Sequence, residues 1–103
     1  MSSSERTSYD FRRAIDVELL NGEPIAKVHA MILSDPVPAH SHNYLIAHLQ
    51  QRVAKDVARE LKRSEKKSSL DDLHAILNRR GASTSQRGFL IHAISMEMQQ
   101  MQQ

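Results

Sequence analysis

The six histidines have the widest range of possible chemistry in this sequence. His40, His42 and His48 fall within nine residues, and a neutral imidazole can bind zinc. His42 and His48 are six residues apart, which does not place them on one face of a helix, so further ligands would have to come from distant parts of the chain. The pattern therefore predicts ordinary loop and surface histidines, with a metal-linked or pH-linked role as the alternative. We expect no metal site and no cofactor.

The carboxylates, hydroxyls and glycines form no catalytic pattern. Asp71 and Asp72 begin an expected helix, where negative charge interacts favourably with the helix dipole. The serines fall in expected caps and linkers, whereas a hydrolase needs a nucleophile, a base and an orienting group placed together. The chain has no cysteine, and Gly22, Gly81 and Gly88 are too scattered to form a phosphate-binding loop. We therefore expect a protein that is not an enzyme.

The positive charge is concentrated in one segment. The 103 residues carry a net charge of +2, but residues 1–36 hold four basic and six acidic side chains, and residues 37–103 hold ten basic and six acidic ones. Most of the excess lies in 52–67, where basic side chains could contact phosphates. The acids within this segment and the scarcity of aromatic residues argue against nucleic acid as the main partner.

A helix-turn-helix-like unit over 70–98 extends this nucleic-acid alternative. Arg79, Arg80 and Arg87 cluster at its turn, although the apolar run 89–94 suits burial better than a DNA groove. A DNA- or RNA-binding regulator would use ten residues: Arg52, Lys55, Arg59, Lys62, Arg63, Lys66, Lys67, Arg79, Arg80 and Arg87.

The last expected helix favours a protein partner. Ile91, Ile94, Met98 and Met101 follow the a–d spacing of a short helical seam, and methionine is common at adaptable binding surfaces. Our main hypothesis is a small non-enzymatic regulator, adaptor or inhibitor that acts through protein–protein contacts on this helix. A homodimer is possible. We expect it in the cytoplasm, since the absence of cysteine is compatible with a reducing compartment. We expect no membrane partner, because no apolar run approaches the length of a membrane helix.

The elements that would hold these residues begin with a predicted β-hairpin. Asn21-Gly22 is a preferred pair for a two-residue turn. In that register the residues on one face are apolar apart from Arg13, and Asp16 lies opposite Lys27. Pro24 is tolerated at a non-hydrogen-bonded position of an edge strand. The alternative is a helix over 9–20, since the same apolar residues also fit helical spacing and Asn21-Gly22 can end a helix.

Three helices follow the Pro-rich connector 35–40. They are predicted over 42–63, 70–79 and 84–100, with capping boxes at Ser69-x-x-Asp72 and Ser83-x-x-Gln86. The fold class is therefore α+β, a single small domain with the order β-β-α-α-α. We expect residues 1–8 to be a disordered lead without a secretory signal, 9–98 to form the domain, and 99–103 to be a frayed tail.

Overall fold

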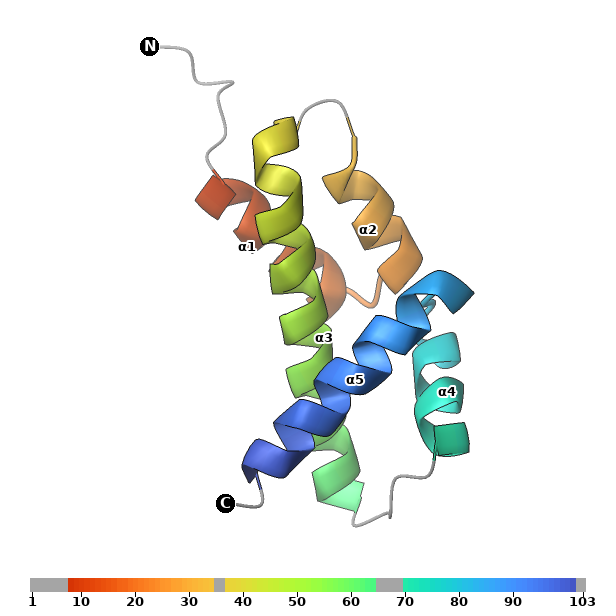
Figure 1. Ribbon diagram of the computed structural model, residues 1–103. Helices are drawn as coiled ribbons and strands as arrows, with labels where there is room; N and C mark the ends of the chain where they lie inside the picture. The colour runs from red at the N-terminus through yellow and green to blue at the C-terminus, as the bar shows by residue number, and fades with distance from the viewer. Residues whose placement is uncertain (1–7, 35–36, 65–69, 102–103) are drawn as a thin grey trace.

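The computed structural model describes residues 8–34, 37–64 and 70–101, and these form helices without any strand. The order is α1 (Ser8–Leu20), α2 (Ile25–Ile32), a short 3-10 turn (Ala39–Ser41), α3 (His42–Ser64), α4 (Leu70–Arg79) and α5 (Thr84–Met101) (Figure 1). Residues 1–7 of the predicted lead lie outside the described part, and α5 extends into the segment 99–103 for which fraying is predicted.

The predicted α+β fold with an N-terminal β-hairpin is wrong, because both arms of the hairpin are helices. α1 buries Phe11 and Ile15, one helical turn apart, whereas Val17 of the predicted apolar strand face is 50% exposed. The alternative helix over 9–20 is therefore confirmed as α1. α2 buries the residues at i, i+3 and i+7 against the same core: Ile25, Val28 and Ile32.

Asn21-Gly22 ends α1 instead of turning a hairpin. Gly22 has a φ of 81°, and its N–H donates to the Leu19 carbonyl over 3.1 Å. The Glu23 N–H donates to the Glu18 carbonyl, also over 3.1 Å, which completes a Schellman cap. Since a tight hairpin turn and this cap both require positive φ at glycine, the dipeptide does not discriminate between them.

The charged pair predicted across the hairpin is also replaced. Lys27 forms an ion pair with Glu23, one turn earlier, with 2.9 Å between Nζ and Oε2. The hydrogen bond to Glu23 raises the pKa of Lys27 above its usual range. Asp16 instead contacts His48 of α3, at 2.8 Å between Oδ1 and Nε2, and so links α1 to the central helix.

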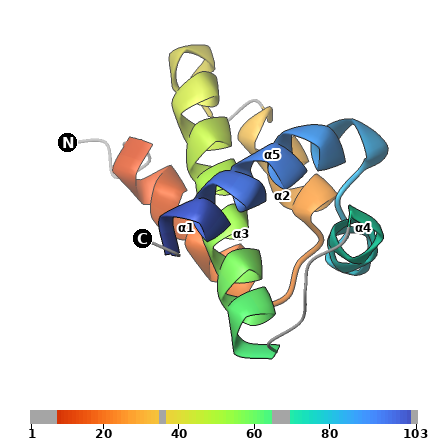
Figure 2. The same cartoon turned by 60° about the horizontal axis from the view of Figure 1, so that its bottom comes forward.

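α3 is the helix around which the others are arranged (Figures 1 and 2). Its buried side chains follow one row at i+4 spacing, with two alanines beside it: Leu45, Leu49, Val53, Val57, Leu61, Ala54 and Ala58. α1, α2 and α5 all contact α3, and the pair of α3 and α5 is the most extensive. α5 buries Leu90 and Ile94 in this core.

α2 begins where α4 ends. The Ile25 N–H donates to the Arg80 carbonyl and the Ala26 N–H donates to the Gly81 carbonyl, each over 2.9 Å. The two N–H groups belong to the first turn of α2, and the two carbonyls lie just past the end of α4. Such groups have no hydrogen-bond partner within their own helices. The contact also brings the positive end of the α2 dipole to the negative end of the α4 dipole. We call these four residues the α4–α2 junction.

A second Schellman cap shapes this junction. Gly81 has a φ of 80°, and the Ala82 N–H donates to the Leu77 carbonyl over 2.9 Å. Leu77 and Ala82 are both buried, as the hydrophobic contact of this cap requires. A Cβ atom on Gly81 would lie 2.5 Å from the Cβ and 2.8 Å from the Cα of Pro24, so the junction has no room for a side chain here.

Replacement of the two cap glycines should separate backbone strain from this close contact. We expect Gly81→Ala to lower the free energy of unfolding by about 2–4 kcal/mol, because left-handed strain adds to the clash with Pro24. Gly22→Ala is the matched control, since Gly22 has the same φ but no atom within 4 Å of its Cβ position, and should cost only about 1–2 kcal/mol. Urea denaturation followed by circular dichroism measures both values. Equal losses would contradict a rigid junction.

Candidate binding surfaces

The structure brings basic residues from two segments of the sequence around one cleft. This arginine cleft has a volume of about 380 Å³ and lies between the end of α1, the second half of α3 and the end of α4. The residues that line it are Leu20, Arg52, Asp56, Arg59, Glu60, Arg63 and Arg80. Four of the ten residues predicted for a nucleic-acid surface thus meet at a single site.

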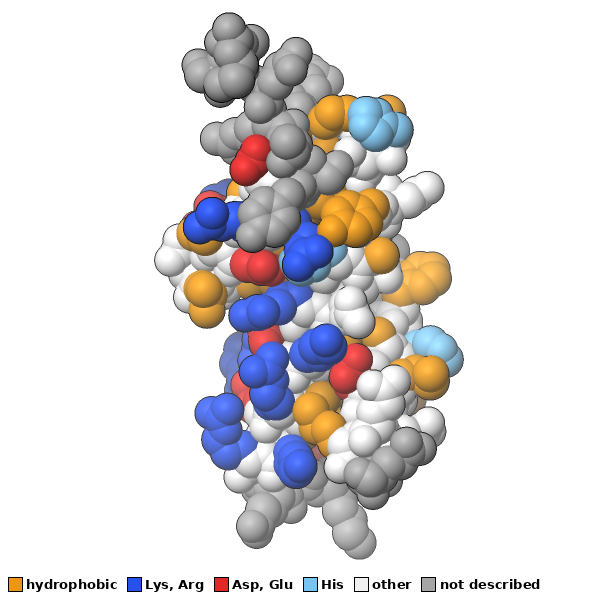
Figure 3. Space-filling model, turned by 90° about the vertical axis from the view of Figure 1, so that its left-hand side faces the viewer, with side chains coloured by type: hydrophobic (Ala, Val, Ile, Leu, Met, Phe, Trp, Pro, Cys, Tyr) orange, Lys and Arg blue, Asp and Glu red, His pale blue; other side chains and the backbone are white. Residues whose placement is uncertain are grey.

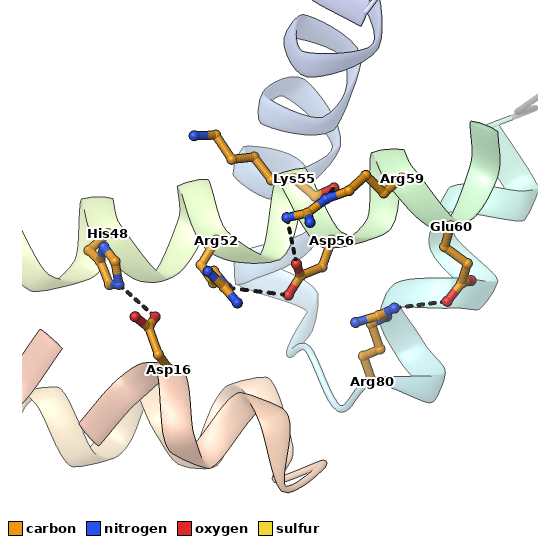
Figure 4. A network of polar contacts seen from close by, with 8 residues as sticks. All are labelled: Asp16, His48, Arg52, Lys55, Asp56, Arg59, Glu60 and Arg80. Atoms are coloured by element: carbon orange, nitrogen blue, oxygen red, sulfur yellow. Dashed lines mark hydrogen bonds and ion pairs between the residues drawn. The ribbon is translucent and has the colours of Figure 1, made fainter. Parts of the chain in front are cut away.

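Two of these arginines share one carboxylate on α3. Arg59 Nη2 lies 3.2 Å from Asp56 Oδ1, and Arg52 Nε lies 3.7 Å from Asp56 Oδ2 (Figure 4). The three residues are three or four positions apart, which places them on neighbouring turns of the helix. Asp56 therefore holds one guanidinium on each side of it at the wall of the cleft.

A second carboxylate connects α3 with α4. Glu60 Oε1 lies 2.8 Å from Arg80 Nη2, and Glu60 Oε2 lies 3.2 Å from Arg79 Nη2 (Figure 4 shows the first pair). The backbone carbonyl of Arg80 belongs to the α4–α2 junction. The backbone of Arg80 is therefore held by α2, and its guanidinium is held by Glu60. This arrangement sets the position of Arg80 relative to the arginines of α3.

The cleft has a net positive charge because four arginines face two carboxylates. Arg63 is exposed and forms no ion pair with any carboxylate among the described residues. Lys55 and Lys62 are exposed on α3 outside the cleft. Figure 3 shows Lys and Arg side chains along this face of the molecule, with Asp and Glu side chains between them.

The other predicted basic residues do not join this site. Arg87 is partly buried and donates through Nη2 to Asn78 Oδ1 over 3.3 Å, while its buried Nε has no hydrogen-bond partner. Arg79 is exposed beside Glu60 but does not line the cleft. Lys66 and Lys67 lie outside the described residues.

The histidines considered as metal ligands have separate local roles. His48 contacts Asp16, whereas His42 Nε2 lies 3.1 Å from the Val37 carbonyl oxygen and His40 is exposed. Among the residues that the structure describes, no group of three or more His, Asp or Glu side chains is arranged to hold a metal ion.

A second concavity is lined mainly by apolar surface. This pocket of about 340 Å³ lies between α2, α3 and the first turns of α5. Its lining includes Ile25, Ile46, Leu49 and Leu90, and Phe89 contributes a side chain that is 69% exposed. Its size falls within the range of small-ligand sites, and its lining includes no Asp, Glu, Lys or Arg. The polar residues of the lining are His29, Gln50, Ser85 and Gln86.

The α5 residues predicted to contact a partner lie on the inner side of the helix. Ile94 is fully buried, and Ile91 and Met98 pack against the core, while Met101 is partly buried. The a–d spacing reflects the packing of α5 on α3 rather than a row of exposed side chains. The sequence pattern could not reveal this, because a core seam and a docking seam have the same period.

Comparison of the chain with protein-family models, curated proteins and solved structures gave no match. None of the helices in the described ranges is both long and apolar enough to cross a membrane. The geometry of the two concavities is therefore the basis for a functional proposal.

Removal of the carboxylate that joins α3 to α4 should weaken the cleft measurably. We expect Glu60→Gln to lower the free energy of unfolding by about 0.5–1 kcal/mol at low salt, because two guanidinium groups lose a partly exposed partner. Asp56→Asn is the matched control: it removes only pairs within one helix and should cost about 0.3–0.5 kcal/mol. Urea denaturation at low and high salt gives both values. Losses that do not shrink as salt is added would contradict an electrostatic role.

Proposed function

We propose that this protein is a small non-enzymatic regulator or adaptor that binds an acidic segment of a partner protein in the arginine cleft. The observation that carries the proposal is the convergence of Arg52, Arg59, Arg63 and Arg80 around one cleft with an exposed leucine, Leu20, at its edge. Arginine is enriched at protein–protein interfaces and pairs well with carboxylates, because its planar guanidinium can donate two parallel hydrogen bonds.

The internal ion pairs prepare the cleft rather than neutralise it. Each guanidinium has five N–H donors, and the contacts with Asp56 and Glu60 use only part of them. The two carboxylates hold the side chains of Arg52, Arg59 and Arg80 in place. A partner carboxylate would therefore meet donors that have already lost much of their conformational freedom.

Several features favour a protein over nucleic acid as the occupant. No aromatic side chain lines the cleft to stack on a base. Leu20 is 76% exposed, and Val17, three residues earlier on the same helix, is 50% exposed. An apolar side chain of a peptide can bury this surface, whereas a phosphate would add little binding free energy there. The expected occupant is a peptide segment that carries Asp or Glu next to a large apolar residue.

Binding of a defined peptide tests this proposal. The probe is a fluorescently labelled synthetic helix built from Glu, Leu and Ala, with Glu and Leu one turn apart, and its anisotropy is measured against the full chain. We expect Arg63→Glu to weaken binding about 10-fold or more, since a cleft contact becomes repulsive, which corresponds to roughly 1.4 kcal/mol. The adjacent Lys62→Glu is the control, because it makes the same charge change outside the cleft and should weaken binding less than about 3-fold.

The same variants distinguish nucleic acid from peptide. Labelled duplex DNA is titrated in parallel across salt concentrations, because a phosphate-binding surface loses affinity steeply as salt increases. Leu20→Ser should weaken only peptide binding. If the chain binds DNA but not the peptide, and Arg63→Glu and Lys62→Glu weaken it equally, the protein is a nucleic-acid binder and the proposal is overturned.

A further inference from the structure

The outer face of α5 is an exposed helix surface without formal charge. Arg87 and Glu97, the charged residues of this helix, are both partly buried, and none of its fully exposed residues is Asp, Glu, Lys or Arg. The exposed side of α3, in contrast, carries Lys55, Lys62 and several arginines. Depletion of charge is typical of the centre of a protein–protein interface. α5 contributes no side chain to the arginine cleft, so this surface is independent of the proposed function.

Large apolar side chains project from this face. Phe89 is 69% exposed and Met96, two helical turns later, is 48% exposed. On an ideal helix they lie at nearly the same angle, with His92 between them. Figures 1 and 2 show α5 on the outside of the bundle, across α3, so none of the other described helices covers its outer side.

The fold of a single chain does not explain why residue 88, on the same face, is glycine. It lies inside a helix, where glycine is unfavourable relative to alanine. Its φ is not positive, and among the described residues no atom other than those of its chain neighbours and its own helical backbone lies within 4 Å of the position that its Cβ would occupy. Neither backbone conformation nor packing against described residues therefore requires glycine here. A glycine at this exposed position would allow a second helix to approach closely.

The face is self-complementary in one register. Two copies of α5 can pack antiparallel with a two-fold axis at His92. Phe89 of one copy then lies beside Met96 of the other. This pair and its symmetry mate form one edge of the interface. On the opposite edge Gly88 lies beside Ser95 of the second copy. Aromatic rings contact methionine sulfur favourably, and the two small residues allow the helices to approach.

We propose that the outer face of α5 is a homodimer interface, formed by antiparallel contact with α5 of a second copy about an axis at His92. A single pair of helices buries less than a standard interface of about 1,600 Å². We therefore expect a reversible dimer with a Kd in the micromolar to millimolar range. Phe89 and Met96 supply its apolar contacts.

Sedimentation velocity of the full chain over a range of concentrations tests the association. Phe89→Glu, at an exposed position, places one negative charge from each copy in the interface beside Met96 of the other copy, and should weaken dimerisation at least about 10-fold. Ala75→Glu, at an exposed position of α4, is the control and should leave association unchanged. Gly88→Gln should raise the thermal unfolding midpoint of the monomer yet weaken the dimer, a combination that a purely structural role of Gly88 would not produce.

Cysteine cross-linking tests the register, because the chain has no cysteine of its own. His92→Cys should form an intermolecular disulfide readily on mild oxidation, since the two copies of this residue meet at the axis. In Ser85→Cys the two sulfurs would be held about 21 Å apart along the helices, so cross-linking should be slow. A chain that remains monomeric at about 1 mM, or equal cross-linking of the two variants, overturns the proposal.

Discussion

Two backbone hydrogen bonds join the start of α2 to the residues that end α4, and each of the two concavities includes a residue of this contact. α2 is only eight residues long and has no side-chain cap, so its first N–H groups would otherwise lack protein partners. The carbonyls of Arg80 and Gly81 satisfy two of them. This contact is possible only because Gly81 adopts positive φ and presents no side chain to Pro24. A long-range constraint between residues 25 and 81 therefore depends on one glycine.

The same junction positions both concavities. The Arg80 carbonyl oxygen accepts a hydrogen bond from the Ile25 N–H at the junction, while the Arg80 guanidinium contacts Glu60. The end of α4 is therefore held against α3 where the arginine cleft forms. Ile25, whose N–H donates to that carbonyl, lines the apolar pocket. α5 starts three residues after Gly81, so its crossing over α3 also begins from this fixed point. The backbone geometry at Gly81 therefore affects the position of the surface side chains on α4 and α5.

The sequence predicted helices correctly where the helical period of the apolar residues, the helix-ending or capping residues and the length of the segment all indicated a helix. The 23-residue α3 and both later helices follow from agreement in period and length, and the Gln86 side chain accepts from the Ser83 N–H as its capping box predicts. Ser69 of the other predicted capping box lies outside the described residues. The prediction for the N-terminal third is wrong because its apolar residues fit both the helical and the strand period over a short span. In addition, Asn21-Gly22 suits either a hairpin turn or a helix end. Burial decides between them: Ile15 is fully buried, and Val17 is not. The basic cluster of α3 was visible in the sequence, but its convergence with Arg80 required the tertiary contact through Glu60.

The division of α5 into two faces shows why function was harder to predict than helix position. Its apolar row from Ile91 to Met98 resembles a partner seam only while the position of α3 is unknown; once α3 covers that row, the free side is the one with Phe89, Gly88 and Met96. The two proposed surfaces are compatible, because the cleft is built from α1, α3 and α4 alone. A dimer joined through α5 would carry two clefts. A partner with two acidic segments would then bind with the effective concentration of a linked pair, so weak individual clefts could still give a stable complex.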